Sequence, residues 1–112
     1  MKRYYTDIGQ SKKLAEILPL KSADMWYSIV DNEPFICLER HYECEQIPCW
    51  SLHTLLNVLP YPHLSKYKLG SGKEEWMVSV YSDNCRYDSW WQASPVDACY
   101  EMILKSHELN LL

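Results

Sequence analysis

Three helix starts, each marked by a capping residue, constrain the fold of this chain more than any other feature of its sequence. Asp7 is followed three residues later by Gln10, which is the pattern of a capping box. Ser51 precedes a run of leucines, and Ser94 precedes Pro95 at the first helical position. The sequence therefore predicts three helices, and the two segments between them must fold in another way.

Apolar runs alternate with turn residues in the segments between the predicted helices. Residues 26–30 and 35–38 are rich in aromatic and β-branched side chains, as are 76–81 and 85–91. Each pair of runs is separated by a short stretch that contains an Asp-Asn step, which favours a turn. We therefore expect an α+β fold, in which about three helices pack on a small antiparallel sheet of four to five strands.

Length and composition indicate a single compact domain over residues 1–112. Apolar residues make up 47% of the chain and charged residues 23%, which is typical of a globular protein and not of a disordered one. The net charge of -4 argues against nonspecific nucleic-acid binding as the main role.

The cysteine content and the first residues of the sequence predict a reducing, cytoplasmic setting. The five cysteines are an odd number, and their spacing matches no disulfide framework. Residues 1–13 are polar and charged and lack the apolar run of a signal peptide. Residues 46–65 carry no charge, but prolines interrupt them, so we expect no membrane span.

Large amphipathic rings are the most unusual part of the composition. Nine Tyr and five Trp stand against one Phe, and such rings suit half-buried positions and contact surfaces. On the second predicted hairpin, Trp76, Trp90 and Trp91 are our candidate contact residues, although alternation places about half of such a cluster toward the core. We therefore favour a non-enzymatic module that binds a protein partner or a second copy of itself, without a cofactor. The alternative for these rings is an ordinary core and its rim.

A second hypothesis comes from four residues that could ligate a metal. His41, Cys44, Cys49 and His53 fall within a short stretch, with a spacing similar to that of a zinc knuckle. This pattern would give a small zinc-stabilised or nucleic-acid-associated module. Against it, the segment is acidic and lacks glycine, and His53 falls in the first turn of a predicted helix.

A third hypothesis is a thiol-dependent enzyme. Cys49 lies just before a predicted helix N-terminus, where the helix dipole lowers the pKa of a thiol. Sequence spacing shows neither the base nor the oxyanion site that a nucleophile needs. No phosphate-binding glycine loop, metalloprotease motif or serine-hydrolase motif occurs in the chain, so catalysis is not favoured.

Three parts of the sequence carry a resemblance to a known group of proteins. They are residues 10–14 with 22–25, residues 47–52 leading into 55–60, and residues 94–103. The chain resembles small uncharacterised proteins encoded by phages and integrated mobile elements of gut bacteria. The resemblance runs from Thr6 to the C-terminus and implies a bacterial or phage cytoplasmic setting and an accessory role. It brings no activity and no catalytic residues, because its motifs are helix caps and core faces.

Overall fold

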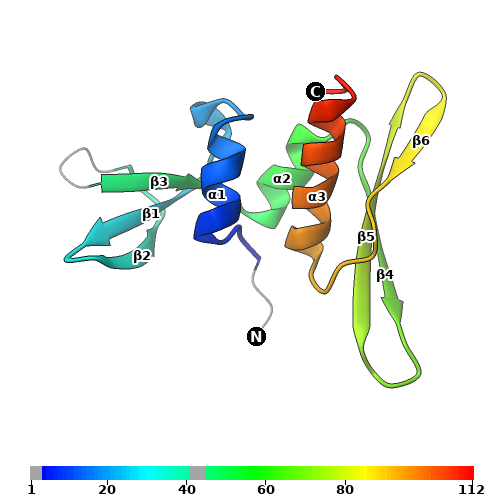
Figure 1. Ribbon diagram of the computed structural model, residues 1–112, viewed down its shortest axis with the longest axis horizontal. Helices are drawn as coiled ribbons and strands as arrows, with labels where there is room; N and C mark the ends of the chain where they lie inside the picture. The colour runs from blue at the N-terminus through cyan, green and yellow to red at the C-terminus, as the bar shows by residue number, and fades with distance from the viewer. Residues whose placement is uncertain (1–3, 41–44) are drawn as a thin grey trace.

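The fold is α+β, with three α-helices between two small antiparallel sheets (Figure 1). This computed structural model describes residues 4–40 and 45–112. The helices of this part are α1 (Ile8–Ala15), α2 (Leu52–Val58) and α3 (Pro95–Glu108), with a short 3₁₀ turn at Leu20–Ser22. The strands are β1 (Met25–Val30), β2 (Glu33–Cys37), β3 (Glu45–Cys49), β4 (His63–Lys68), β5 (Glu74–Ser82) and β6 (Cys85–Asp88).

All three predicted helix starts are confirmed. The backbone N–H of Gln10 donates to the Asp7 carboxylate at 2.7 Å, and the Gln10 side chain accepts from the Asp7 N–H at 3.1 Å, which completes the capping box. Ser51 caps α2, and the hydroxyl of Ser94 accepts from the N–H of Asp97 at 3.0 Å to cap α3. These short-range bonds satisfy N–H groups that a helix start leaves without partners.

Both predicted hairpins are also confirmed, and they use the same turn. Asp31 and Asn32 connect β1 to β2 with φ angles of 54° and 62°. Asp83 and Asn84 connect β5 to β6 with φ angles of 49° and 65°. Two consecutive residues with positive φ give the type I′ turn, whose twist matches that of antiparallel strands.

The prediction of one sheet with four to five strands is wrong. The described residues form two sheets of three strands each: a first sheet with the order β2-β1-β3 and a second sheet with the order β4-β5-β6. Strands β3 and β4 escape a search for apolar alternation, because β3 contains Pro48 and β4 is mostly polar. Each of them becomes a strand by pairing with a neighbour that the sequence does identify, β1 and β5 respectively.

The two sheets contribute to different hydrophobic clusters. The second sheet packs on α3 through the inward-facing residues Val78 and Val80 of β5, which have no exposed surface, and α2 packs on α3 in turn. The main cluster formed in this way contains Leu14, Leu18, Trp50, Leu55, Leu59, Val78, Val80, Val96, Ala98, Cys99, Met102 and Ile103. The first sheet has a small cluster of its own, formed by Tyr27, Ile47 and Cys49. Most of the buried apolar surface is therefore on the side of the second sheet.

The C-terminal leucines are only partly docked. Leu111 packs against the main cluster, whereas Leu109 and Leu112 are each nearly half exposed. In the described part of the chain, no helix is both long enough and apolar enough to cross a membrane.

Candidate interaction site

A β-bulge at the end of β6 carries two of the three predicted contact residues. The backbone N–H of Ser89 donates to the carbonyl of Val78 at 2.8 Å, in the register of the β5–β6 pair. Further along, Trp76 and Gln92 exchange two backbone hydrogen bonds, at 2.7 and 2.8 Å. Two residues, Trp90 and Trp91, therefore lie opposite the single residue Met77. This two-against-one arrangement defines a bulge, a feature that redirects side chains at a sheet edge.

Ser89 produces the break in the ladder. Its side-chain hydroxyl accepts the N–H of Val78 at 2.9 Å, in the place of a backbone carbonyl. The same hydroxyl donates to the carbonyl of Trp90 at 3.1 Å. Ser89 is buried, and its bond with Val78 is shielded from water, whereas its bond to Trp90 is partly buried. One serine thus ends the regular pairing of β6 and fixes the backbone that presents both tryptophans.

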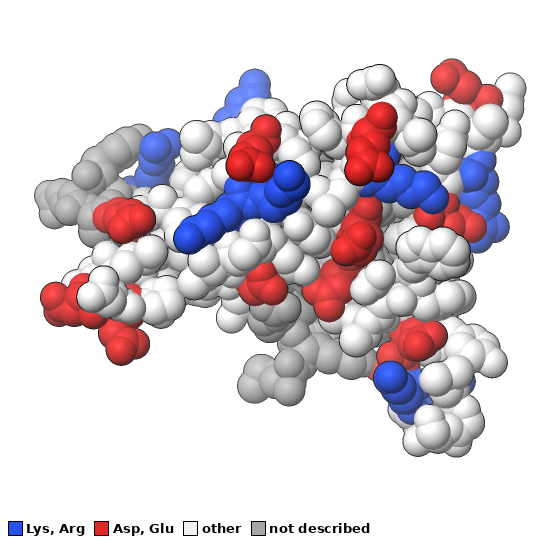
Figure 2. Space-filling model, in the orientation of Figure 1, with Lys and Arg blue, Asp and Glu red and all other residues white. Residues whose placement is uncertain are grey.

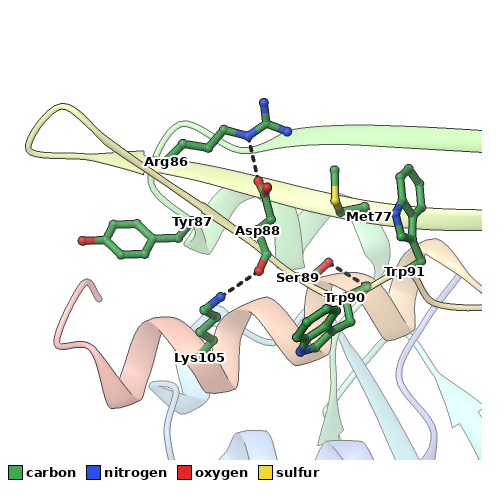
Figure 3. A pocket seen from close by; sticks show the side chains of 8 residues that line it. All are labelled: Met77, Arg86, Tyr87, Asp88, Ser89, Trp90, Trp91 and Lys105. Atoms are coloured by element: carbon green, nitrogen blue, oxygen red, sulfur yellow. Dashed lines mark hydrogen bonds and ion pairs between the residues drawn. The ribbon is translucent and has the colours of Figure 1, made fainter.

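The two tryptophans of the bulge point to different sides of the chain (Figure 3). Trp91 lies beside Met77 and contacts Tyr67 with ring centroids 6.0 Å apart. Trp90 points toward α3 and is 81% exposed, against 43% for Trp91. A tryptophan with most of its surface in water is uncommon, because burying this side chain is strongly favourable.

Trp76 has a different role from the other two predicted contact residues. It is half-buried and packs against the main cluster, and the ammonium of Lys66 lies 5.3 Å from the centre of its ring. Strand alternation puts it on the face of Val78, opposite to Met77. The structure thus brings Trp90 and Trp91 together at the bulge and places Trp76 in the packing beneath it.

An open cavity of about 400 Å³ surrounds the bulge. Its lining runs along the chain from Arg86 to Trp91 and is completed by Met77 of β5 and Lys105 of α3 (Figure 3). A second hollow of about 320 Å³ lies against α3, lined on that side by Glu101, Leu104, Lys105 and Glu108. The two hollows adjoin, because four residues line both of them: Asp88, Ser89, Trp90 and Lys105.

The charged groups of the first cavity are largely engaged with each other. The carboxylate of Asp88 accepts from the hydroxyl of Ser79 at 2.6 Å and from Nε of Arg86 at 2.7 Å. The hydrogen bond from Ser79, with that from Arg86, lowers the pKa of Asp88 below its usual value. The ammonium of Lys105 donates to the main-chain carbonyl of Asp88 at 2.9 Å. The site is therefore an aromatic surface with a fixed ion pair beside it.

The two residues of the zinc hypothesis that the structure describes, Cys49 and His53, lie in different environments. His41 and Cys44 lie outside the described residues. Cys49 has no exposed surface and its thiol donates to the carbonyl of Thr6 at 3.5 Å. His53 is exposed on α2, with Nε2 3.1 Å from the side-chain nitrogen of Asn57. Among residues 4–40 and 45–112, no group of three His, Cys, Asp or Glu could hold a metal ion.

The expectation that Cys49 has a lowered pKa is wrong. Burial raises the pKa of its thiol, and the hydrogen bonds from Thr6 and Ser11 do not reverse this effect. Cys99 shows the same behaviour more strongly, because burial raises the pKa of its thiol to about 12. A reactive thiol needs the opposite environment, with a positive charge and access to solvent. Cys49 is a core residue that closes the small cluster beneath α1.

Sequence reasoning identified the tryptophans but missed the bulge. Ser89, Asp88 and Lys105 were not among the candidates, although they fix the backbone around Trp90. One signal was present, because two adjacent tryptophans follow a strand whose alternation would otherwise place one of them in the core.

Comparison with family models, with curated proteins and with solved structures gives no significant match for this chain.

Proposed function

We propose that this protein is a non-enzymatic binding module whose contact surface is the bulge at Trp90 and Trp91. The observation that carries the proposal is Trp90, a large aromatic side chain held in water by a hydrogen-bonded backbone. Tryptophan is the residue type most enriched among the contacts that dominate protein–protein affinity. The accessory role in a bacterial or phage cytoplasm, which the sequence resemblance implies, belongs to the same proposal.

The surroundings of Trp90 support a role in binding rather than in catalysis. Asp88 accepts hydrogen bonds from Ser79 and Arg86 at one carboxylate oxygen, and like an ordinary aspartate it is ionised at neutral pH and has no proton to give as a general acid. Rigid presentation of an aromatic ring lowers the entropy that binding must overcome. The bulge provides such rigidity, since backbone and side-chain hydrogen bonds fix both of its ends.

The proposal can be tested with a photo-crosslinking amino acid. Benzoylphenylalanine is placed at position 90 and, as a matched control, at Tyr61, a loop residue that is 83% exposed and lies away from the bulge. Each variant is irradiated in a bacterial lysate and alone at the same concentration. We expect a discrete adduct, with another protein or a second copy, at position 90 but not at position 61. Equal or absent crosslinking at both positions would contradict the proposal.

A further inference from the structure

We propose that the occupant of this surface is an extended segment of a partner protein, which adds to the free edge of β6 and places a lysine or arginine against Trp90. The inference rests on the proposed function and specifies the chemistry of the partner. Three observations support it: the free edge of β6, the groove between this edge and α3, and the charges on the wall of that groove.

The free edge of β6 offers main-chain groups to a partner strand. In the described part of the chain, β6 pairs with β5 on one side only. The N–H of Ser89 is directed to β5, so the alternation of an antiparallel ladder directs the groups of Arg86 and Asp88 to the other side. The bond from Lys105 to the Asp88 carbonyl shows that this carbonyl does point outward. An unpaired edge of this kind is a template for one more strand.

Lys105 covers this edge without closing it. A flexible lysine is a common means of blunting a sheet edge, and its ammonium occupies one carbonyl only. The outward N–H of Asp88 and both outward groups of Arg86 have no partner within the described residues. A strand that adds here therefore displaces one hydrogen bond and forms several.

The other three edge strands of the described residues differ from β6. Strand β4 carries exposed lysines at positions 66 and 68, whereas β2 contains Pro34 and β3 contains Pro48, and a proline has no N–H to offer. None of these three strands lines the two hollows beside Trp90. The edge of β6 is thus the one that combines main-chain groups with a groove.

The groove favours a cationic side chain. The charged residues that line the hollow against α3 are three carboxylates, Asp88, Glu101 and Glu108, and one ammonium, Lys105, so the carboxylates outnumber the cation; Trp90 lines the same hollow. Acidic side chains run along α3 on this face of the molecule (Figure 2). A tryptophan face attracts a cation through its ring quadrupole, and the carboxylates add an ion pair. The net charge of -4 also attracts a basic partner and repels an acidic one.

The test uses a capped peptide of alternating valine and lysine and the full chain labelled with ¹⁵N. We expect saturable shifts of the Arg86 and Asp88 amides and of the Trp90 indole. The same peptide with alternate backbone nitrogens methylated should cause none of these shifts, because it cannot form the ladder. A valine–glutamate peptide should bind at least tenfold more weakly.

Variants separate the contributions of the ring and the charges. Trp90→Ala should weaken the lysine peptide about tenfold, whereas Tyr61→Ala should change its affinity less than twofold. The double change Glu101→Gln and Glu108→Gln should weaken the lysine peptide severalfold and leave a valine–threonine peptide unaffected. The matched control, Glu33→Gln with Glu39→Gln, alters exposed carboxylates of the first sheet and its flank and should have no effect.

Several results would overturn the inference. Binding of the methylated peptide equal to that of the parent would exclude strand addition. Shifts centred on Tyr67 and Met77 would place the partner on the other face of the sheet. Shifts of Arg86 and Asp88 on concentrating the protein alone would make a second copy the occupant. If no peptide binds while crosslinking at position 90 still succeeds, strand addition fails and the proposed function stands; if both fail, both fall.

Discussion

The two sheets of this protein are built from the same parts and yet have different roles. Each has three antiparallel strands and one hairpin closed by an Asp-Asn turn. The second sheet rests on the main hydrophobic cluster, and the first closes a cluster of only three buried residues. Both sheets expose an aromatic side chain, Phe35 of β2 at 48% and Trp90 after β6 at 81%, but the more exposed one lies on the sheet with the larger cluster. The bulge occurs on the second sheet, where the stability of the main hydrophobic cluster offsets the unfavourable exposure of Trp90 to water.

The topology of the two sheets also differs. The second sheet is a simple meander, in which each strand pairs with the next one along the chain. In the first sheet, β1 is central and β3 returns to its free side after β2. Strand β2 therefore separates β1 from β3 in the chain, so pairing β3 with β1 closes a longer loop and costs more entropy than forming a hairpin.

The largest expected effect is the loss of stability when a cavity is created in each of the two hydrophobic clusters. Ile103→Ala in α3 should lower the free energy of unfolding by about 4 kcal/mol, and Ile47→Ala in β3 by about 2 kcal/mol. Ile103 is fully buried in the main cluster, whereas Ile47 retains 8% exposure in the small one. Alanine is favoured in a helix and disfavoured in a strand, so intrinsic propensity alone would make Ile47→Ala the more destabilising change. A larger loss for Ile103→Ala must therefore come from the cavity. Urea unfolding measures both values; a larger loss for Ile47→Ala would reverse the ranking of the two sheets.

A second experiment compares the local opening of the clusters in the native state. Cys49 and Cys99 are both fully buried, one in each cluster. We expect a small thiol reagent to modify Cys49 at least tenfold faster than Cys99, which corresponds to about 1.4 kcal/mol less opening free energy. Peptide mapping by mass spectrometry at several times gives the two rates. Exposed Cys85 serves as the internal control for a thiol that needs no opening. Equal slow rates would show that both clusters open only in global unfolding.

The paired turns give a matched test of cooperativity. Asn32 and Asn84 occupy the second position of equivalent turns, with φ angles of 62° and 65°. Replacement of either by alanine should lower the free energy of unfolding by about 1 kcal/mol, because alanine lacks the short polar side chain that can form a local hydrogen bond in this left-handed conformation. If Asn84→Ala lowers the global stability and Asn32→Ala does not, the first sheet unfolds separately. Glycine at each position is the control and should restore the stability.

The smallest effect concerns acid stability. The hydrogen bond from Ser79, together with Arg86, lowers the folded-state pKa of Asp88 below that of the unfolded chain. The stabilisation is therefore present above an unfolded pKa of about 3.9 and is lost as the pH falls through the folded value. Asp88→Asn should flatten the acid limb of the stability curve by less than about 1 kcal/mol, since the carboxylate is partly solvated. An acid limb as steep as in the parent would show that Asp88 contributes nothing.

The outer strands show why pattern reasoning recovered only part of the architecture. Residues 26–30 and 76–81 have apolar and β-branched side chains because they occupy the centres of sheets, so their pattern is strong. Strand β4 has an exposed or half-buried side chain at every position, which leaves little pattern to detect. With two outer strands undetected, the remaining ones were assigned to one sheet.

The sequence by itself determined the helix starts and the hairpin turns. Each depends on a bond or a backbone angle within a few residues, such as the capping box of Asp7 and the positive φ of Asn84. It also determined that tryptophans follow the last hairpin. Only the tertiary structure decided that Trp90 is exposed and Trp76 packed, that Cys49 is buried, and that Lys105 of α3 meets the edge of β6. The physical reason is that burial and strand pairing join residues far apart in the chain, so no local preference specifies them.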